Sequence, residues 1–226
     1  MLKIAEIFAS VQGEGVFVGV PSVFVRVSGC NLRCHWCDTP YASWHPEGES
    51  ASVAEVVARV RAYGVRHVVL TGGEPMLFDE MAELAQHLAA AGHHLTFETA
   101  GTVDRLVPCD LMSISPKLAH STPADPDWGP RHEARRLNLP VLRSLIARYP
   151  SQLKFVVSSP EDLDEIAALL AQLHPLPPDR VVLMPEGVVA EVLAERAAWI
   201  VPACIERGWR YSPRLHIDLF GNRRGT

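Results

Sequence analysis

Three cysteines stand close together in the segment SGCNLRCHWCDT, with the spacing Cys-x3-Cys-x2-Cys. Thiolates are soft ligands that bind zinc, copper(I) or iron–sulfur clusters. A structural zinc site needs four ligands, and only His35, between two of the cysteines, is a local candidate for the fourth. Three thiolates on a four-iron cluster leave one iron open to a substrate or cofactor. The spacing predicts a [4Fe–4S] cluster on Cys30, Cys34 and Cys37, with a zinc knuckle or an electron-transfer cluster as alternatives.

The rest of the composition is that of an ordinary globular protein. The chain has 226 residues, 48% hydrophobic and 21% charged, with a net charge of −5, which favours one domain over residues 1–226 and gives no sign of a basic nucleic-acid surface. No apolar run is long enough to cross a bilayer, and the N-terminus lacks the apolar core of a signal peptide. We therefore expect a cytoplasmic protein without a disulfide framework. Cys109 and Cys204 are expected to be small buried hydrophobic side chains.

A glycine-rich turn, TGGEP at residues 71–75, follows a predicted strand and precedes a predicted helix. Its two glycines would let the backbone approach a ligand closely, with amide groups facing outward. Glu74 could accept a hydrogen bond from a cationic amine. Further along, Ser115 and Lys117 offer a hydroxyl and a cation. Each feature also has a simpler interpretation, because a Gly-Gly pair can be only a turn and Lys117 only a solvated side chain.

Short apolar runs alternate with Ala- and Leu-rich stretches, which predicts parallel strands joined by right-handed helical crossovers. The expected strands are 22–28, 66–71, 94–99, 110–115, 153–158, 180–185 and 214–220. The expected helices are 52–64, with Ser52 as its cap, 79–92, 141–149, 161–173 and 188–208. These make roughly six β/α units, whereas a closed eight-unit barrel needs about 250 residues. We therefore expect an α/β fold, a partial, open β/α barrel, with a doubly wound sheet as second choice and residues 116–140 as a mobile excursion.

Polar or glycine-rich residues follow the predicted strands at their carboxyl ends. Cys30 follows the first strand and residues 71–75 the second, while residues 98–99 end the third and residues 115–117 follow the fourth. Ligands of parallel α/β folds bind beyond the carboxyl ends of the strands. We therefore expect these separate segments to converge on one rim.

Three further features bear on the ligand. The loop QGEG at residues 12–15 suits a compact polar ligand, or is a simple hairpin-like turn. Arg26 lies inside a predicted strand, and a buried charge must be paired; its partner is either Glu14 or the carboxylate of a ligand, which a guanidinium fits well. Asp38 and Thr39 directly follow the last cysteine and carry oxygen ligands that Mg²⁺ accepts, although a Thr after Asp can also be a helix N-cap.

Taken together, the cysteine spacing and the GGE turn resemble the radical SAM superfamily. In that superfamily the open iron chelates S-adenosyl-L-methionine (SAM), and reductive cleavage yields a 5′-deoxyadenosyl radical. The stretches EIFASVQGEGVFVGVPSVFVRVSGCNLRCHWCDT, VVLTGGEP, FETAG, SPKL and RLHIDLFGNRRGT resemble the 7-carboxy-7-deazaguanine synthase family of queuosine and 7-deazapurine biosynthesis. The resemblance runs through most of the chain. It departs at Ala100, where many superfamily members carry Asn.

The resemblance implies a carbon–nitrogen lyase that acts on 6-carboxy-5,6,7,8-tetrahydropterin. Abstraction of the C6 hydrogen by the radical, followed by ring contraction with loss of ammonia, would give 7-carboxy-7-deazaguanine, and SAM would be regenerated. Mg²⁺ would bridge Thr39 and substrate oxygens. The implied substrate contacts are Val11, Gln12, Gly13, Glu14, Arg26 and Thr71. The implied SAM contacts are Trp36, Cys37, Asp38, Gly73, Glu74, Ser115 and Lys117.

The resemblance also implies a homodimer and a reductant such as flavodoxin or ferredoxin, without nucleic-acid or membrane partners. His216 and the tail FGNRRGT could close over the substrate, although Arg223 and Arg224 could equally be solvated. Two other classes stay open, an activating enzyme that installs a glycyl radical on a partner protein and a non-catalytic Fe–S or zinc protein. The QGEG loop and Arg26 favour a small carboxylated substrate over a protein backbone.

Overall fold

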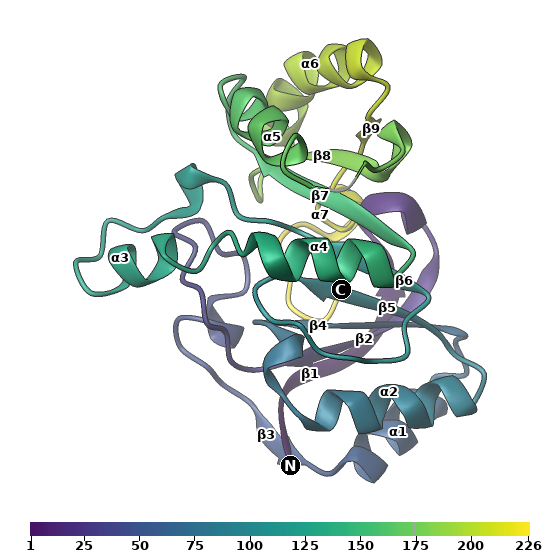
Figure 1. The fold of residues 1–226 in the computed structure, drawn as a ribbon. Helices are drawn as coiled ribbons and strands as arrows, with labels where there is room; N and C mark the ends of the chain where they lie inside the picture. Colours follow the sequence, from purple (N-terminus) through teal and green to yellow (C-terminus); the bar gives the residue numbers. More distant parts are fainter. Residues whose placement is uncertain (174) are drawn as a thin grey trace.

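A sheet of nine strands runs through the described part of the chain, and helices cover its outer side (Figure 1). The computed structural model describes residues 1–173 and 175–226. The strands are β1 Leu2–Val11, β2 Pro21–Val27, β3 Glu49–Ala51, β4 His67–Gly72, β5 His94–Thr99, β6 Leu111–Ile114, β7 Ser151–Val157, β8 Val181–Pro185 and β9 Arg210–Tyr211. The α-helices are α1 Val53–Ala62, α2 Glu80–Ala90, α3 Trp128–Glu133, α4 Leu139–Arg148, α5 Asp162–Leu170, α6 Ala190–Arg207 and α7 Leu215–Phe220. The 3-10 turns are η1 Gly15–Phe17, η2 Pro40–Ala42, η3 Pro75–Leu77, η4 Ala119–Ser121 and η5 Pro178–Arg180.

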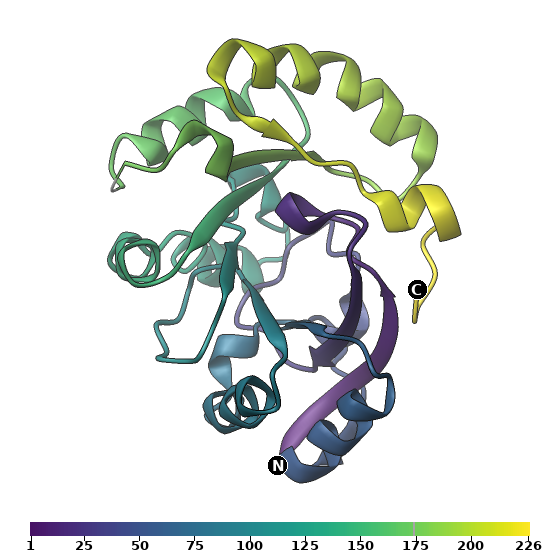
Figure 2. The same ribbon diagram turned by 90° about the vertical axis from the view of Figure 1, so that its right-hand side faces the viewer.

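The sheet is an open, mostly parallel barrel. Its strand order is β3-β1-β2-β4-β5-β6-β7-β8-β9. Neighbouring strands from β2 to β9 pair in parallel, whereas β1 is antiparallel to both β2 and β3. Figure 2 shows the sheet as an arc with helices outside it and with β1 and the C-terminal segment near its open side. The expected partial β/α barrel is confirmed, and the doubly wound sheet is not the fold.

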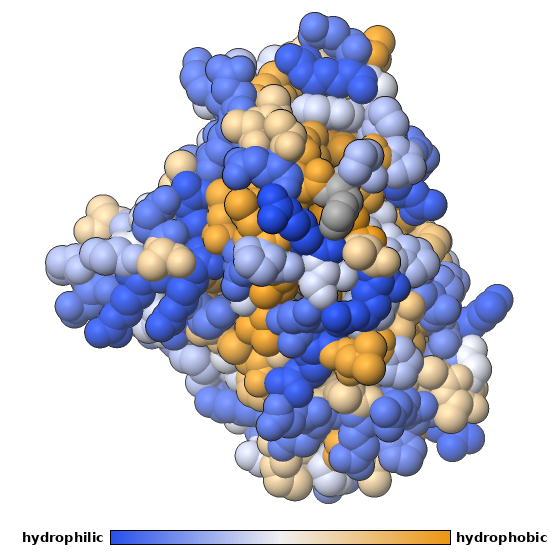
Figure 3. All heavy atoms as spheres, viewed as in Figure 1, coloured by the Kyte–Doolittle hydropathy of each residue, from blue (hydrophilic) through white to orange (hydrophobic). Residues whose placement is uncertain are grey.

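Most of the predicted elements form because local pattern and burial agree. Strands β7 and β8 are buried along their whole length, as expected for central parallel strands. Helix α1 begins at Ser52, whose hydroxyl accepts from Glu55 N while the Glu55 carboxylate accepts from Ser52 N at 2.7 Å. Phe97 and Phe155 are the largest fully buried side chains of the core. On the face in Figure 3, hydrophobic residues appear in patches between hydrophilic ones.

The N-terminal residues Leu2–Val11 form a strand that is absent from the strands expected from the sequence. Strand β1 pairs with β2 as a hairpin, and the loop between them includes the QGEG segment. Gln12 N donates to Val20 O at 2.8 Å, and Gly19 N donates to Gln12 O at 2.7 Å. This loop is therefore a hairpin turn, as one of the two interpretations of the sequence predicted. A hairpin turn can also bind a ligand, so the other interpretation stays open.

Residues 214–220 contain helix α7, so the predicted strand there is wrong. Apolar and polar residues alternate in RLHIDLF as they would in a strand, but short runs of this kind are ambiguous. Ile217 N donates to Arg214 O at 2.8 Å, which turns the backbone into a helix that buries Ile217 and exposes Leu219. The neighbouring position at the sheet edge is already taken by β9.

The segment 116–140 contains η4, α3 and the start of α4, and it packs beside the loop that carries the cysteines. By contrast, the connection at residues 100–110, between β5 and β6, contains neither a helix nor a strand. In the described ranges, no helix combines the length and the apolar character needed to span a membrane.

Candidate active site

A cavity of about 510 Å³ lies inside the open barrel. Alternate residues of the strands form its wall: Glu6, Phe8, Phe24, Arg26, Thr71, Glu98, Ser113, Lys154, Val156 and Met184. Successive side chains of a strand point to opposite faces of the sheet, so every second residue faces the cavity. Loops at the carboxyl ends of the parallel strands form the rest of its wall. The predicted convergence of separate segments on one rim is confirmed.

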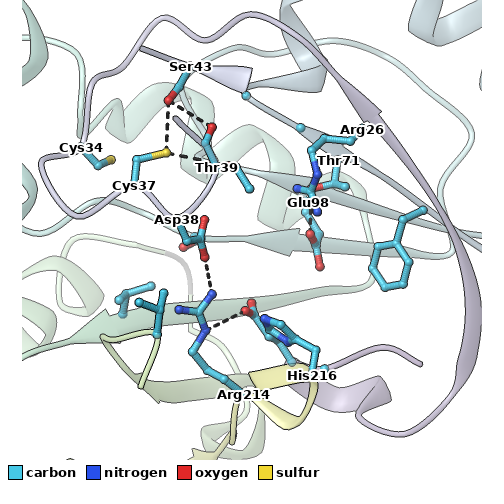
Figure 4. A pocket seen from close by; sticks show the side chains of 18 of the residues that line it. Arg26, Cys34, Cys37, Asp38, Thr39, Ser43, Thr71, Glu98, Arg214 and His216 are labelled. Atoms are coloured by element: carbon cyan, nitrogen blue, oxygen red, sulfur yellow. Dashed lines mark hydrogen bonds and ion pairs between the residues drawn. The ribbon is translucent and has the colours of Figure 1, made fainter. Parts of the chain in front are cut away.

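All three predicted cluster cysteines line this cavity. Burial raises the pKa of Cys30 to about 12 and the pKa of Cys34 to about 11. These thiols therefore keep their protons until a cation replaces them. Cys37 Sγ lies 3.1 Å from Ser43 Oγ (Figure 4). Iron supplies the positive charge that buried thiolates need, so the three cysteines fit a cluster.

The other thiols and the neighbouring imidazole lie outside the cavity. His35, the local candidate for a fourth ligand, is exposed and does not line it. Cys204 is buried, and Cys109 is partly buried with its Sγ 3.8 Å from Leu95 O. Both behave as small core side chains, as expected.

The TGGEP turn packs tightly against the end of β2. A Cβ on Gly73 would lie against the carbonyl oxygens of Gly29 and Ala42, and one on Gly72 would lie against Val27. Gly73 N donates to Val27 O at 3.1 Å. The amide of Gly73 is therefore engaged within the fold, and the expectation that it faces outward is wrong. Close backbone approach explains both glycines, which still line the cavity.

The structure does not bring the Glu74 carboxylate to the cavity. The residue is fully buried, and its Oε1 accepts from Thr99 Oγ1 and its Oε2 from Ala100 N, both at 2.8 Å. A third bond comes from Met76 N at 3.1 Å. Burial raises the pKa of Glu74 in spite of these hydrogen bonds. Glu74 thus ties the turn after β4 to the end of β5.

Trp36, Ser115 and Lys117 come together on the cavity wall. Lys117 Nζ donates to Ser115 Oγ at 2.8 Å and lies 5.6 Å from the centre of the Trp36 ring. Trp36 Nε1 in turn donates to His120 Nδ1 at 3.1 Å. A hydroxyl and an ammonium group therefore lie side by side next to an aromatic face.

Asp38 and Thr39 also line the cavity, directly after Cys37. The Asp38 carboxylate accepts from Arg214 (Figure 4). Burial alone would raise the pKa of Asp38, but Arg214 holds it below its usual value. Thr39 precedes η2 without a side-chain capping bond, and its Oγ1 lies 3.8 Å from Cys37 Sγ. The N-cap interpretation of Thr39 therefore does not account for its hydroxyl.

Arg26 is paired with Glu6 rather than with Glu14. The two residues face each other in the β1–β2 register, and Arg26 Nε donates to Glu6 Oε1 at 2.6 Å. Tyr41 donates to the same oxygen at 2.8 Å. Of the two expected partners, Glu14 is wrong, because β1, which supplies Glu6, is not recognised as a strand in the sequence. Arg26 also lines the cavity, where the carboxylate of a ligand can reach it.

Glu14 lies between two cations, Lys154 and Arg214. Lys154 Nζ donates to one carboxylate oxygen of Glu14, and Arg214 Nε donates to the other at 3.2 Å. Burial alone would raise the pKa of Glu14, but the two cations hold it far below its usual range. Burial likewise would lower the pKa of Lys154, and Glu14 raises it. All three groups stay charged in the cavity wall.

Glu98 is the centre of a second polar group. Its Oε1 accepts from Gln12 Nε2 at 3.1 Å and its Oε2 from Thr71 Oγ1 at 2.8 Å. Gln12 Oε1 also accepts from Glu14 N at 3.1 Å. The hairpin loop therefore reaches into the barrel and meets side chains of β4 and β5.

The C-terminal segment closes one side of the cavity. His216 and residues 222–226 line it. Arg224 Nε lies 3.5 Å from Glu6 Oε2, and its guanidinium lies 4.0 Å from the centre of the Tyr41 ring. Arg224 therefore contacts the cavity wall, although its side chain stays 44% exposed to solvent.

The sequence pattern places Glu98 on the rim without a role, and it does not single out Glu6, Lys154 or Arg214. A usable signal exists for two of them, because Glu98 and Lys154 are charges inside apolar strands, as Arg26 is. Arg214 has no such signal, since its segment is wrongly predicted as a strand.

An open parallel barrel with three cysteines after its first parallel strand and a GGE turn after the next defines a radical SAM enzyme. The model of the Radical SAM superfamily matches residues 24–121, which include both motifs. The catalytic chemistry of this class requires a [4Fe–4S] cluster and SAM, and the cysteines and the rim fit both.

Full-length relatives narrow the class. The chain is 47% identical over 238 residues to a 7-carboxy-7-deazaguanine synthase of Halobacterium salinarum, covering 100% of this chain and 93% of the relative. It is 48% identical over 230 residues to that of Rhodopirellula baltica, covering 100% and 89%. A crystal structure of QueE from Escherichia coli aligns with a TM-score of 0.72 at 28% identity, over 95% of this chain and 94% of that one. The chain belongs to the 7-carboxy-7-deazaguanine synthase family. It is a radical SAM lyase, and neither the glycyl-radical activator nor a non-catalytic metal protein is favoured.

Proposed function

We propose that the chain converts 6-carboxy-5,6,7,8-tetrahydropterin into 7-carboxy-7-deazaguanine with loss of ammonia. One observation carries the proposal. A single cavity has thiols at one side and, at the other, a guanidinium together with a carboxylate that accepts hydrogen bonds (Figure 4). Such a cavity can hold a cluster and SAM at one end and a small polar carboxylated ring at the other.

Cys30, Cys34 and Cys37 hold the [4Fe–4S] cluster through their thiolates. When bound, the cluster and SAM supply a 5′-deoxyadenosyl radical that takes the hydrogen from C6 of the pterin. Cys34 is buried and Cys30 and Cys37 are half-buried, which limits the access of water to this end of the cavity. The release of thiol protons on metal binding is favoured by the positive charge of the iron.

The SAM site is formed by Ser115 and Lys117 together with the aromatic wall and the glycine turn. Lys117 offers an ammonium group to the carboxylate of SAM, and Ser115 a hydroxyl to its ribose. Glu74 acts on the SAM site indirectly, because hydrogen bonds to its carboxylate hold the turn that contains Gly73. The remaining residues assigned to this site are Trp36, Cys37 and Asp38.

The pterin lies against the hairpin loop and the inward side chains of β2 and β4. Arg26 binds the substrate carboxylate, since its guanidinium offers paired donors of the right geometry. The Glu98 carboxylate accepts from N–H groups of the pterin ring, with Gln12 and Thr71 alongside. The other residues assigned to this site are Val11, Gly13 and Glu14.

Thr39 would hold Mg²⁺, because its hydroxyl is a hard oxygen ligand on the cavity wall. The neighbouring Asp38 carboxylate is held by Arg214 and acts as an outer partner. An ion held there would supply positive charge to oxygens of the substrate.

We further assign the whole of residues 1–226 to one radical SAM domain that acts as a homodimer. A flavodoxin or ferredoxin would supply the electron. Light scattering of the purified protein tests the dimer, and electron transfer from each reductant tests the donor.

The decisive experiment is anaerobic reconstitution of the cluster, followed by addition of SAM, dithionite and the carboxypterin. The expected result is a deazapurine chromophore without net consumption of SAM. A loaded cluster that cleaves SAM but leaves the pterin unchanged would disprove the substrate. A loaded cluster that forms no 5′-deoxyadenosine under any condition would disprove the radical reaction.

A further inference from the structure

The loop that carries the cysteines has almost no structure of its own. Residues 28–38, the cysteine loop, contain neither a helix nor a strand. One backbone hydrogen bond, from Cys37 N to Cys34 O at 3.2 Å, joins two of the cysteines. The shape of this loop therefore depends on contacts with other parts of the chain. In Figure 1, α3 lies on the same side of the molecule as the segment after β2.

One set of these contacts comes from residues 118–136, which we call the brace. Others come from Lys3, Ala42, Trp44, Glu74 and Thr102, which lie elsewhere in the chain. His35 N donates to Ser121 O at 3.0 Å. Arg33 N donates to His132 Nδ1 at 3.1 Å. The Arg33 guanidinium also lies 4.1 Å from the centre of the Trp128 ring, a cation–π distance. Two backbone amides between Cys30 and Cys37 are thus satisfied by the brace.

His132 is the most constrained residue of the brace. It is fully buried in α3. Its Nδ1 accepts from Arg33 N, so this nitrogen carries no proton. Its Nε2 lies 2.9 Å from Ser121 Oγ, which donates to Leu118 O at 2.7 Å. Because Ser121 has one hydroxyl proton, His132 Nε2 must carry the proton of the second bond. Only one neutral tautomer satisfies every partner.

The same arrangement decides where the Arg33 amide points. Because the Arg33 N–H donates to His132, it cannot also point toward a cysteine sulfur. His132 therefore fixes the backbone conformation between Cys30 and Cys34. Residues that hydrogen-bond to metal ligands, without binding the metal themselves, commonly set the orientation of the ligands and the affinity for the metal.

We propose that the brace holds the cysteine loop in its cluster-binding shape and that His132 is the positioning residue, acting through the Arg33 amide. The inference rests on the proposed assignment of Cys30, Cys34 and Cys37 to the cluster. It adds a residue outside every motif of the sequence, from a segment that the sequence predicts to be a mobile excursion.

Two substitutions at one position test the acceptor. His132→Asn keeps an acceptor oxygen near the place of Nδ1, whereas His132→Phe fills the site without one. The measurement is the rate at which the anaerobically reconstituted protein loses its cluster absorbance to excess chelator. We expect roughly tenfold faster loss in His132→Phe and a rate near that of the unchanged protein in His132→Asn. Hydrogen exchange of the cluster-free protein should show faster exchange over residues 31–36 in His132→Phe alone.

A matched control separates positioning from general destabilisation. Val56→Ala removes buried volume from α1, which packs against α2 and β1, and should lower the melting temperature without changing cluster loss. Equal rates for His132→Phe and the unchanged protein would overturn the inference, as would equally fast loss from both His132 variants. If the unchanged protein itself bound no iron after reconstitution, the cysteine assignment would fail instead.

Discussion

Arg214 and Glu14 form an ion pair inside the barrel, with Arg214 Nε 3.2 Å from Glu14 Oε1, although 200 residues separate them in the chain. The same guanidinium binds Asp38 and donates to Gly187 O at 2.6 Å. Arg214 therefore joins the hairpin loop, the end of the cysteine loop and the connection after β8. Burial alone would lower the pKa of Arg214, but Asp38 and Glu14 raise it. Two carboxylates thus share one buried cation, and Glu14 has Lys154 as a second cation.

Replacing Arg214 should destabilise the protein strongly. Arg214→Gln leaves Asp38 without its cation and Glu14 with Lys154 alone, and breaking a buried pair typically costs about 3–5 kcal/mol. Arg214→Lys keeps the charge but cannot reach all partners, so an intermediate loss is expected. Urea unfolding of the cluster-free protein measures both. Arg59→Gln, which breaks an exposed pair, should cost less than about 1 kcal/mol; a similar cost at both positions would contradict the assignment.

Arg26→Ala should weaken pterin binding while SAM cleavage without substrate persists. A hydrogen bond to a charged group contributes about 1.5–3 kcal/mol, so the affinity should fall roughly 10- to 100-fold. Arg26→Lys should recover part of it. Pterin titration of the loaded enzyme and the yield of 5′-deoxyadenosine are the two measurements. Loss of the cluster in Arg26→Ala would indicate a folding role shared with Glu6 instead.

Glu98→Gln should also impair substrate binding, because the amide nitrogen cannot accept from ring N–H groups and would face the donors Gln12 and Thr71. The Michaelis constant should rise by roughly tenfold or more, with cluster content unchanged. Glu83→Gln, at a side chain that is 60% exposed, is the matched control and should have no effect. An unchanged Michaelis constant in Glu98→Gln would remove Glu98 from the pterin site.

The neutral imidazole of His132 should appear in the pH dependence of stability. Burial lowers the pKa of His132 from 6.5 to about 4. The unfolded chain therefore binds the proton more readily, so the stabilisation is complete above about pH 6.5 and is lost as the pH falls toward 4. The loss amounts to about 3 kcal/mol. The unfolding free energy of the cluster-free protein should fall less over this interval in His132→Asn; equal slopes would show that another group titrates.

Local patterns predict much of the fold and the cluster ligands correctly. The helical spacing of apolar residues, the apolar runs of the parallel strands and the cap at Ser52 can each be identified within a short segment of the sequence. They fail at β1 and at α7, which are both segments of mixed polarity. Strand β1 takes its structure from pairing with β2, and α7 from contacts around Arg214. The open barrel is predicted from the number of β/α units, and that number is obtained by counting predicted strands and helices, each of which has a local sequence pattern.

The sequence by itself determined the role of the three cysteines and the position of the glycine turn. Ligands that lie within one loop or turn can be recognised from their spacing, without knowledge of any distant residue. Only the tertiary structure decided which charges meet. The partner of Arg26 depends on the register of a hairpin, and the group formed by Glu14, Lys154 and Arg214 depends on the curvature that brings the two ends of the sheet together. The support of the cysteine loop by His132 was likewise decided in three dimensions, since an imidazole about 100 residues away reaches that loop only when the chain has folded.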